Sequence, residues 1–409
     1  MMISKLKLVV PVLLLLAVSA EGGVVYLSFN QHSTQNLFQT RNAVADQISA
    51  FSLSINQDFS AVSLLAGLQY SAFREMSGLS SFGADIGLDY LKPAGAKSAF
   101  YFAAGGSGLF YRQTYEAFSA LGANLLAAFK TYLAPSSILK LQGQGAYAAY
   151  KDNLFDFVST MASLSIDKYF ATRTTFKAEA EWGYKYFLHP FLPEPAEPLL
   201  EPVAAIAASK GLGSGSRNGS GMGWGGADYQ GGNGFIPRTS SEGGGVGIGH
   251  VSLSVLAAQG LGDVAGLSVS ALRQWIVTGE NPFLSIEEFY LVQNPSSDAF
   301  SWDGSQFNGR FTLNLPWSVE IKAGYTYADK TFPGVESMSL EGVPLGIVRN
   351  DLRHLFEARL EKNFRRVSLF LTYSWVDNRS SDPLFVWKSH FLMGGFEWNL
   401  PTGRKGGAS

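Results

Sequence analysis

Apolar and charged residues alternate with a period of two along the segment 176–186, which reads FKAEAEWGYKY. Successive side chains of a strand point to opposite faces, so Phe176, Trp182 and Tyr184 share one face while Lys177 and Glu181 share the other. The apolar face ends in aromatic residues, and the same design recurs along nearly the whole chain. Alternation of this kind is typical of a barrel with lipid outside and water inside.

The alternation predicts sixteen strands in all. We expect them at 24–30, 47–56, 60–73, 81–91, 98–111, 116–132, 138–150, 156–169, 174–187, 247–260, 266–276, 302–315, 318–328, 352–364, 367–376 and 386–400. The first is the weakest because it is short. A total of fourteen is the alternative, in which two of these segments form one bent strand or lie in a loop.

The connections between these strands alternate in length. Short ones lie near 57–59, 92–97, 133–137, 170–173, 261–265, 316–317 and 365–366. The others are mostly longer and lie near 31–46, 74–80, 188–246, 277–301, 329–351 and 377–385, and only those at 112–115 and 151–155 are brief. Bacterial outer-membrane barrels have short periplasmic turns, longer extracellular loops and an even number of strands. The sequence therefore predicts an all-β fold: a closed, antiparallel, up-and-down transmembrane β-barrel.

The bulk composition agrees with strands and not with helices. Only 16 % of the residues are charged, the mean hydropathy is +0.07, and no run of about 20 apolar residues is present, as a membrane-spanning helix requires. The 31 basic and 33 acidic residues leave a formal net charge of −2, which argues against nucleic acid as a partner. The chain has no cysteine, so disulfides and thiolate metal sites are excluded.

The N-terminal segment has the pattern of a secretory signal peptide. Lys5 and Lys7 precede an apolar run over residues 8–18, and Ser19 and Ala20 supply the small residues that a signal peptidase requires. We therefore expect residues 1–20 to be a cleaved signal peptide, residues 21–400 to form the barrel and residues 401–409 to be a tail.

The last predicted strand resembles the closing strand of bacterial outer-membrane β-barrel proteins. Its alternating apolar residues are Leu392, Gly394, Phe396, Trp398 and Leu400. The resemblance implies a porin-like channel in the bacterial outer membrane that lets small hydrophilic solutes diffuse passively. It also implies outer-membrane lipid, lipopolysaccharide and the barrel-assembly machinery as partners, and a monomer or a homotrimer. The chain of this superfamily commonly ends on an aromatic residue, whereas residues 401–409 follow here.

The long connection at 188–246 lacks strand periodicity. Its first part is rich in proline and glutamate, and its second part is rich in glycine and serine. Two interpretations are open, an extracellular surface loop and a loop that folds into the lumen and narrows it.

Charged residues on the polar phase of the strands are expected to face the lumen. They are Asp85, Asp89, Lys140, Lys177, Glu179, Glu181, Lys185, Glu320, Lys322, Arg353, Glu357, Arg359 and Glu361. Because both signs occur, we expect weak selectivity by charge and sieving mostly by size. The alternative is that these charges form cross-strand ion pairs that brace the wall.

No arrangement of residues predicts catalysis, a metal or a cofactor. None of the five histidines has a metal-binding spacing, and His390 and its neighbour Ser389 would face opposite sides of a strand. We therefore expect the protein not to be an enzyme. Two other functions stay open, a surface adhesion barrel that uses the 188–246 loop and a transporter of apolar small molecules.

Overall fold

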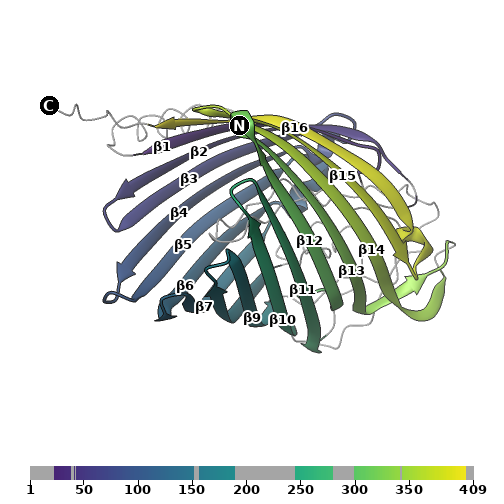
Figure 1. Ribbon diagram of the computed structural model, residues 1–409. Helices are drawn as coiled ribbons and strands as arrows, with labels where there is room; N and C mark the ends of the chain where they lie inside the picture. The colour runs from purple at the N-terminus through teal and green to yellow at the C-terminus, as the bar shows by residue number, and fades with distance from the viewer. Residues whose placement is uncertain are drawn as a thin grey trace.

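The computed structural model describes residues 23–37, 41, 43–151, 156–188, 245–279, 299–340 and 343–401. Over these residues sixteen antiparallel strands each pair with their neighbours in sequence, and the last pairs with the first, which closes the barrel (Figure 1). The sixteen strands predicted from the alternation are confirmed, and the alternative of fourteen is wrong. No helix among the described residues is long and apolar enough to cross a membrane.

The strands run as follows. They are β1 (Val24–Thr34), β2 (Asp46–Phe59), β3 (Val62–Phe73), β4 (Ser81–Pro93), β5 (Ser98–Tyr111), β6 (Ala120–Ala134), β7 (Ser137–Tyr150), β8 (Phe157–Tyr169), β9 (Thr174–Phe187), β10 (Val246–Leu261), β11 (Ala265–Thr278), β12 (Asp303–Leu315), β13 (Val319–Met338), β14 (Pro344–Asn363), β15 (Val367–Ser380) and β16 (Trp387–Pro401).

The first strand, which the sequence marks only weakly, closes the wall. β1 pairs from Val24 to Thr34 with β2 on one side and with β16 on the other. In Figure 1 this purple strand therefore lies beside the yellow last strand. Pairing on both sides leaves no open edge, so each backbone donor and acceptor of the wall can be satisfied inside the protein.

The outer face of the wall is an apolar band. On β8, Leu164 is half exposed, and the register places it between Leu141 of β7 and Ala180 of β9. Its predecessor Ser163 points the other way and lies beside Glu181. Lipid-facing and lumen-facing residues thus alternate along the strands, as the sequence pattern predicts.

The short connections lie at the end of the barrel that also holds both ends of the wall, where Val24 pairs with Pro401. Several of them contain residues with positive φ, among them Ser60, Arg173 and Trp317. Outer-membrane barrels have short periplasmic turns and longer extracellular loops, so we call this end the periplasmic end and the opposite one the extracellular end.

One predicted long loop is wrong. Residues 329–338 and 344–351 form instead the extended ends of β13 and β14, with Glu336 paired to Val348 and Met338 to Pro344. Asp382 fastens this ribbon to the 3₁₀ turn η5 (Pro383–Phe385), because its carboxylate accepts the N–H groups of Met338 (3.1 Å) and Leu384 (2.9 Å). Burial raises the pKa of the Asp382 carboxyl above its usual range.

An apolar cluster fills part of the lumen at the extracellular end. We call it the mouth cluster, and it consists of Leu37, Ile48, Phe73, Leu79, Tyr111, Tyr115 and Tyr150. Four members are lumen-facing strand residues, whereas Leu37, Leu79 and Tyr115 come from the connections after β1, β3 and β5. Leu79 ends the 3₁₀ turn η1 (Ser77–Leu79), and Tyr115 lies in η2 (Gln113–Phe118). These three connections therefore fold inward over one side of the mouth.

Three predictions about domains lie wholly or mostly outside the described residues. They are the signal peptide at 1–20, the loop at 188–246, of which 189–244 are not described, and the tail at 401–409, of which only Pro401, the last residue of β16, is described. They stay predictions.

The apolar band predicts how the barrel responds to a charge at mid-wall. We expect Leu164→Arg to lower the free energy of unfolding from lipid vesicles by about 2–4 kcal/mol, because the guanidinium would enter hydrocarbon. Urea titration of the protein folded into vesicles measures this value. Ser163→Arg is the matched control, since its side chain points into the lumen, and an equal loss in both variants would contradict the assignment of faces.

Candidate functional site

The structure places every predicted lumen residue on the inner face of the wall. They are Asp85, Asp89, Lys140, Lys177, Glu179, Glu181, Lys185, Glu320, Lys322, Arg353, Glu357, Arg359 and Glu361. Most of them gather on two stretches of wall, β7–β9 and β13–β14. Their role in selectivity stays a prediction.

The inner charges pair mainly along their own strands. On β13, Lys322 lies 2.5 Å from Glu320, and on β14, Arg359 lies 2.9 Å from Glu361. Antiparallel register sets Glu320 opposite Glu361 and Lys322 opposite Arg359, so the cross-strand neighbours carry like charges. The two pairs on β13 and β14 thus run along the strands, and cross-strand bracing by the inner charges stays a prediction. Side chains two apart on a strand share a face and lie close enough to pair, which compensates for the like charge opposite.

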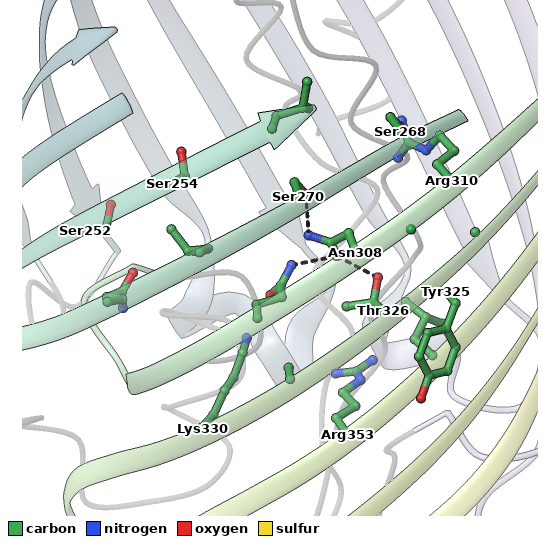
Figure 2. Close-up of a pocket in the computed structure, with 18 of the residues that line it drawn as sticks. Ser252, Ser254, Ser268, Ser270, Asn308, Arg310, Tyr325, Thr326, Lys330 and Arg353 are labelled. Carbon is green, nitrogen blue, oxygen red and sulfur yellow. Dashed lines mark hydrogen bonds between the residues drawn. The ribbon is translucent and has the colours of Figure 1, made fainter. Parts of the chain in front are cut away.

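A polar cavity of about 690 Å³ opens along the inner wall of β9–β14, and we call it the polar trough (Figure 2). Hydroxyl and amide side chains make up its centre. They are Ser252 and Ser254 of β10, Ser268, Ser270 and Gln274 of β11, Gln306 and Asn308 of β12, and Thr326 of β13.

Asn308 organises the centre of the polar trough. Its Nδ2 donates to Ser270 Oγ at 3.1 Å, and its Oδ1 accepts from Thr326 Oγ1 at 2.8 Å and from Gln306 Nε2 at 3.1 Å. Ser270, Asn308 and Thr326 are direct register partners on three adjacent strands, so the pairing of the wall itself aligns them. Figure 2 shows this line of hydrogen bonds across the trough. The floor is therefore held in one arrangement before a solute enters.

Opposite charges flank this uncharged centre. Glu179 and Glu181 border the trough on β9, whereas Arg310, Lys330 and Arg353, together with one acid, Glu357, border it on β12, β13 and β14. A solute in the trough would thus lie on hydroxyl and amide groups between an acidic flank and a basic flank.

The basic flank is held by its own neighbours. Lys330 Nζ lies 4.3 Å from the ring centroid of Trp302. Arg310 and Glu357 lie on either side of Gly324 in the register, and Glu357 is nearly buried. Because glycine contributes no side chain at this point, the guanidinium and the carboxylate can share the space above it.

Toward the extracellular end, the acidic flank passes into a closed cluster. The ring of His250 is fully buried, with Nε2 3.1 Å from Glu181 Oε1 and with its face against the edge of Phe300. A Cβ at position 183 would collide with this ring, so Gly183 makes room for it. Lys185 is also buried, with its Nζ 4.2 Å from the Phe157 centroid. Lys185 therefore faces inward but does not border the trough.

Two charged trough residues were missing from the sequence-based candidates. Arg310 follows the polar phase of its strand, between Asn308 and Thr312, so the alternation could have identified it. Lys330 lies beyond the predicted end of the strand at residue 328, although β13 continues to Met338.

Two tyrosine–histidine pairs lie on the outer face of the wall. Tyr325 follows the trough residue Gly324 on β13, but its ring is on the outer face, where its hydroxyl lies 2.7 Å from Nδ1 of His354. Ser389 is buried on the inner face of β16, whereas His390 faces outward and bonds to Tyr373 (2.6 Å). Within the described ranges, no three metal-binding side chains gather in one place.

No protein-family model matches the chain, and no curated protein matches it either. Solved structures that resemble it include the outer-membrane protein OpdK from Pseudomonas aeruginosa, with 10 % identity, a TM-score of 0.46, and coverage of 93 % of this chain and 99 % of that one. OccAB1 from Acinetobacter baumannii has 8 % identity and a TM-score of 0.45, with 93 % and 96 % covered. OmpT of Vibrio cholerae has 11 % identity and a TM-score of 0.42, with 93 % and 99 % covered. The closed wall of sixteen strands, apolar outside and polar inside, makes this chain a membrane-spanning antiparallel β-barrel.

Proposed function

We propose that the protein is a channel through which small hydrophilic solutes diffuse passively, with weak selectivity by charge. The polar trough carries the proposal, because it is a water-accessible cavity of about 690 Å³ on the inner wall of a closed barrel. A barrel of about sixteen strands is wide enough for an aqueous lumen. Hydroxyl and amide groups at its centre can replace the hydrogen bonds that a polar solute loses with water.

The arrangement of the inner charges supports weak selectivity. The acids Glu320 and Glu361 lie opposite each other, and the bases Lys322 and Arg359 lie opposite each other two residues further toward the extracellular end. A passing ion would therefore meet both signs of charge within a short length of the lumen. A strongly selective filter would instead need a ring of one sign.

The mouth cluster and the polar trough lie on different stretches of the inner wall. The cluster covers the lumen beside β2, β3, β5 and β7, whereas the polar trough lies along β9–β14. Apolar side chains offer no hydrogen bonds to a hydrated solute, so the trough is the stretch of wall that favours such a solute.

The proposal includes the expected location and partners. The protein would reach the bacterial outer membrane with a cleaved signal peptide and the barrel-assembly machinery, contact lipid and lipopolysaccharide, act as a monomer or homotrimer, and have no catalytic role. The hydroxyl-lined trough argues for hydrophilic solutes over apolar ones. An adhesion function of the 188–246 loop would be compatible with the same wall.

Purified protein in a planar bilayer is expected to give stepwise conductance with little preference between potassium and chloride. Lys322→Gln with Arg359→Gln removes two inner positive charges, so the reversal potential in a salt gradient should shift toward cation preference. Lys168→Gln with Lys362→Gln is the control, because these lysines lie on the outer phase of β8 and β14. Silent bilayers despite verified insertion would refute the channel, and an equal shift in the control would refute the assigned faces.

The mouth cluster is expected to limit conductance. Leu79→Ala with Tyr115→Ala removes two side chains that are buried in it, so single-channel conductance should rise. The Leu79 change alone should also lower the free energy of unfolding by about 2–5 kcal/mol. Tyr147→Ala on the lipid face serves as the control and should leave conductance unchanged. Unaltered conductance in a folded double variant would show that the narrowest point lies elsewhere.

A further inference from the structure

Five polar side chains gather on the outer face of the barrel, at the extracellular ends of β15 and β16 and at the same level on β14. We call this group the β15–β16 cationic cluster, and it consists of His354, Asp377, Arg379, Lys388 and His390. The register sets His354 opposite Asp377 and Asp377 opposite Lys388, on the phase that carries the lipid-facing residues Phe356 and Tyr373 further down the wall. These five side chains therefore point away from the lumen.

Asp377 holds the two cations together. Its carboxylate is nearly buried, with Oδ2 3.0 Å from Lys388 Nζ and 3.7 Å from Arg379 Nη2. The Lys388 and Arg379 side chains are both 65 % exposed, so their charged ends lie at the surface while the acid lies beneath them. The three residues carry a net positive charge, and the two cations are already close to each other before any ligand arrives.

The two histidines connect the cluster to the apolar band. Nδ1 of His390 lies 2.6 Å from the Tyr373 hydroxyl, and Nδ1 of His354 lies 2.7 Å from the Tyr325 hydroxyl. Tyr373 and Tyr325 are both exposed on the outer face. Aromatic residues of this kind mark the boundary between hydrocarbon and headgroups, so the cations immediately beyond them lie at headgroup level.

The acids nearest to the cluster on this face have partners of their own. Asp329 of β13 accepts from Asn350 Nδ2 at 2.9 Å, and Asp303 of β12 lies 2.8 Å from Arg273 Nη2. Asp377 is the acid that contacts Lys388 and Arg379, and it is the one that is buried.

We propose that the β15–β16 cationic cluster binds a phosphate group of an outer-leaflet glycolipid of the lipid A type. A phosphate carries up to two negative charges and takes two adjacent cationic donors, which Arg379 and Lys388 supply. The imidazoles of His354 and His390 lie beside them, and the acyl chains would extend along the apolar band below. The inference rests on the outer-membrane placement but not on conduction through the lumen.

The test measures binding of bisphosphorylated lipid A to the full-length protein in detergent by native mass spectrometry. Arg379→Gln with Lys388→Gln should weaken binding about tenfold or more, because each cation near a charged lipid surface contributes substantially. Arg365→Gln with Arg366→Gln is the matched control, since these exposed arginines lie in the periplasmic turn between β14 and β15 and should leave binding unchanged.

Three further measurements distinguish phosphate binding at this cluster from loss of folding and from general binding of anionic lipids. Conductance and heat-modifiable gel migration of the Arg379/Lys388 variant should match wild type, which shows that the barrel is intact and that conduction is independent of the site. Dephosphorylated lipid A should bind the wild type as weakly as bisphosphorylated lipid A binds the variant. Wild-type binding to phosphatidylglycerol equal to that of lipid A, or full lipid A binding by the variant, would overturn the proposal.

Discussion

The pairing of backbone hydrogen bonds around the wall is the constraint on which this structure depends. A donor or acceptor left open in hydrocarbon costs several kcal/mol, so the sheet must close on itself. The weakly patterned β1 is required for this reason, since it supplies the partner that both β2 and β16 need. Closure also fixes every register, and register decides which side chains meet. The Ser270–Asn308–Thr326 line and the Asp377–Lys388 contact are both consequences of strand pairing.

The two faces of one strand carry different kinds of side chain, and both repeat with a period of two residues. On β14, Arg359 and Glu361 pair with each other on the inside, while Phe356 and Leu360 meet lipid on the outside. Like charges opposite each other on β13 and β14 would repel if they stood alone. Their opposite-signed neighbours two residues along compensate, so the inner wall can carry many charges without a strong field of one sign. An exchange of one such pair would therefore change the charge of the inner wall without touching the lipid face.

Periodicity was sufficient to predict the strands, their number and the faces of their residues, because a period of two is a local property of sequence. It failed at residues 329–351, where Pro333, Gly334 and Gly346 interrupt the pattern although β13 and β14 still pair. Periodicity could not predict the mouth cluster either, since Leu37, Leu79 and Tyr115 lie in connections whose packing depends on distant strands. Arg310 could have been predicted from its phase, whereas the hydrogen bonds of Asn308 required the register of three strands.

The lumen is asymmetric, and its asymmetry follows from where apolar residues lie in the extracellular connections. Those after β1, β3 and β5 bring Leu37, Leu79 and Tyr115, which can be buried only against inward apolar residues such as Ile48 and Phe73. The hydrophobic effect therefore draws these connections over β2–β7. Smaller apolar clusters form on the other side, one of Phe187, Ile248 and Phe300 and one of Trp302, Phe332 and Phe385. Burial of apolar surface therefore sets where the described extracellular connections pack against the inner wall. The polar trough lies along β9–β14, where hydroxyl and amide side chains are gathered between these clusters and the short turns.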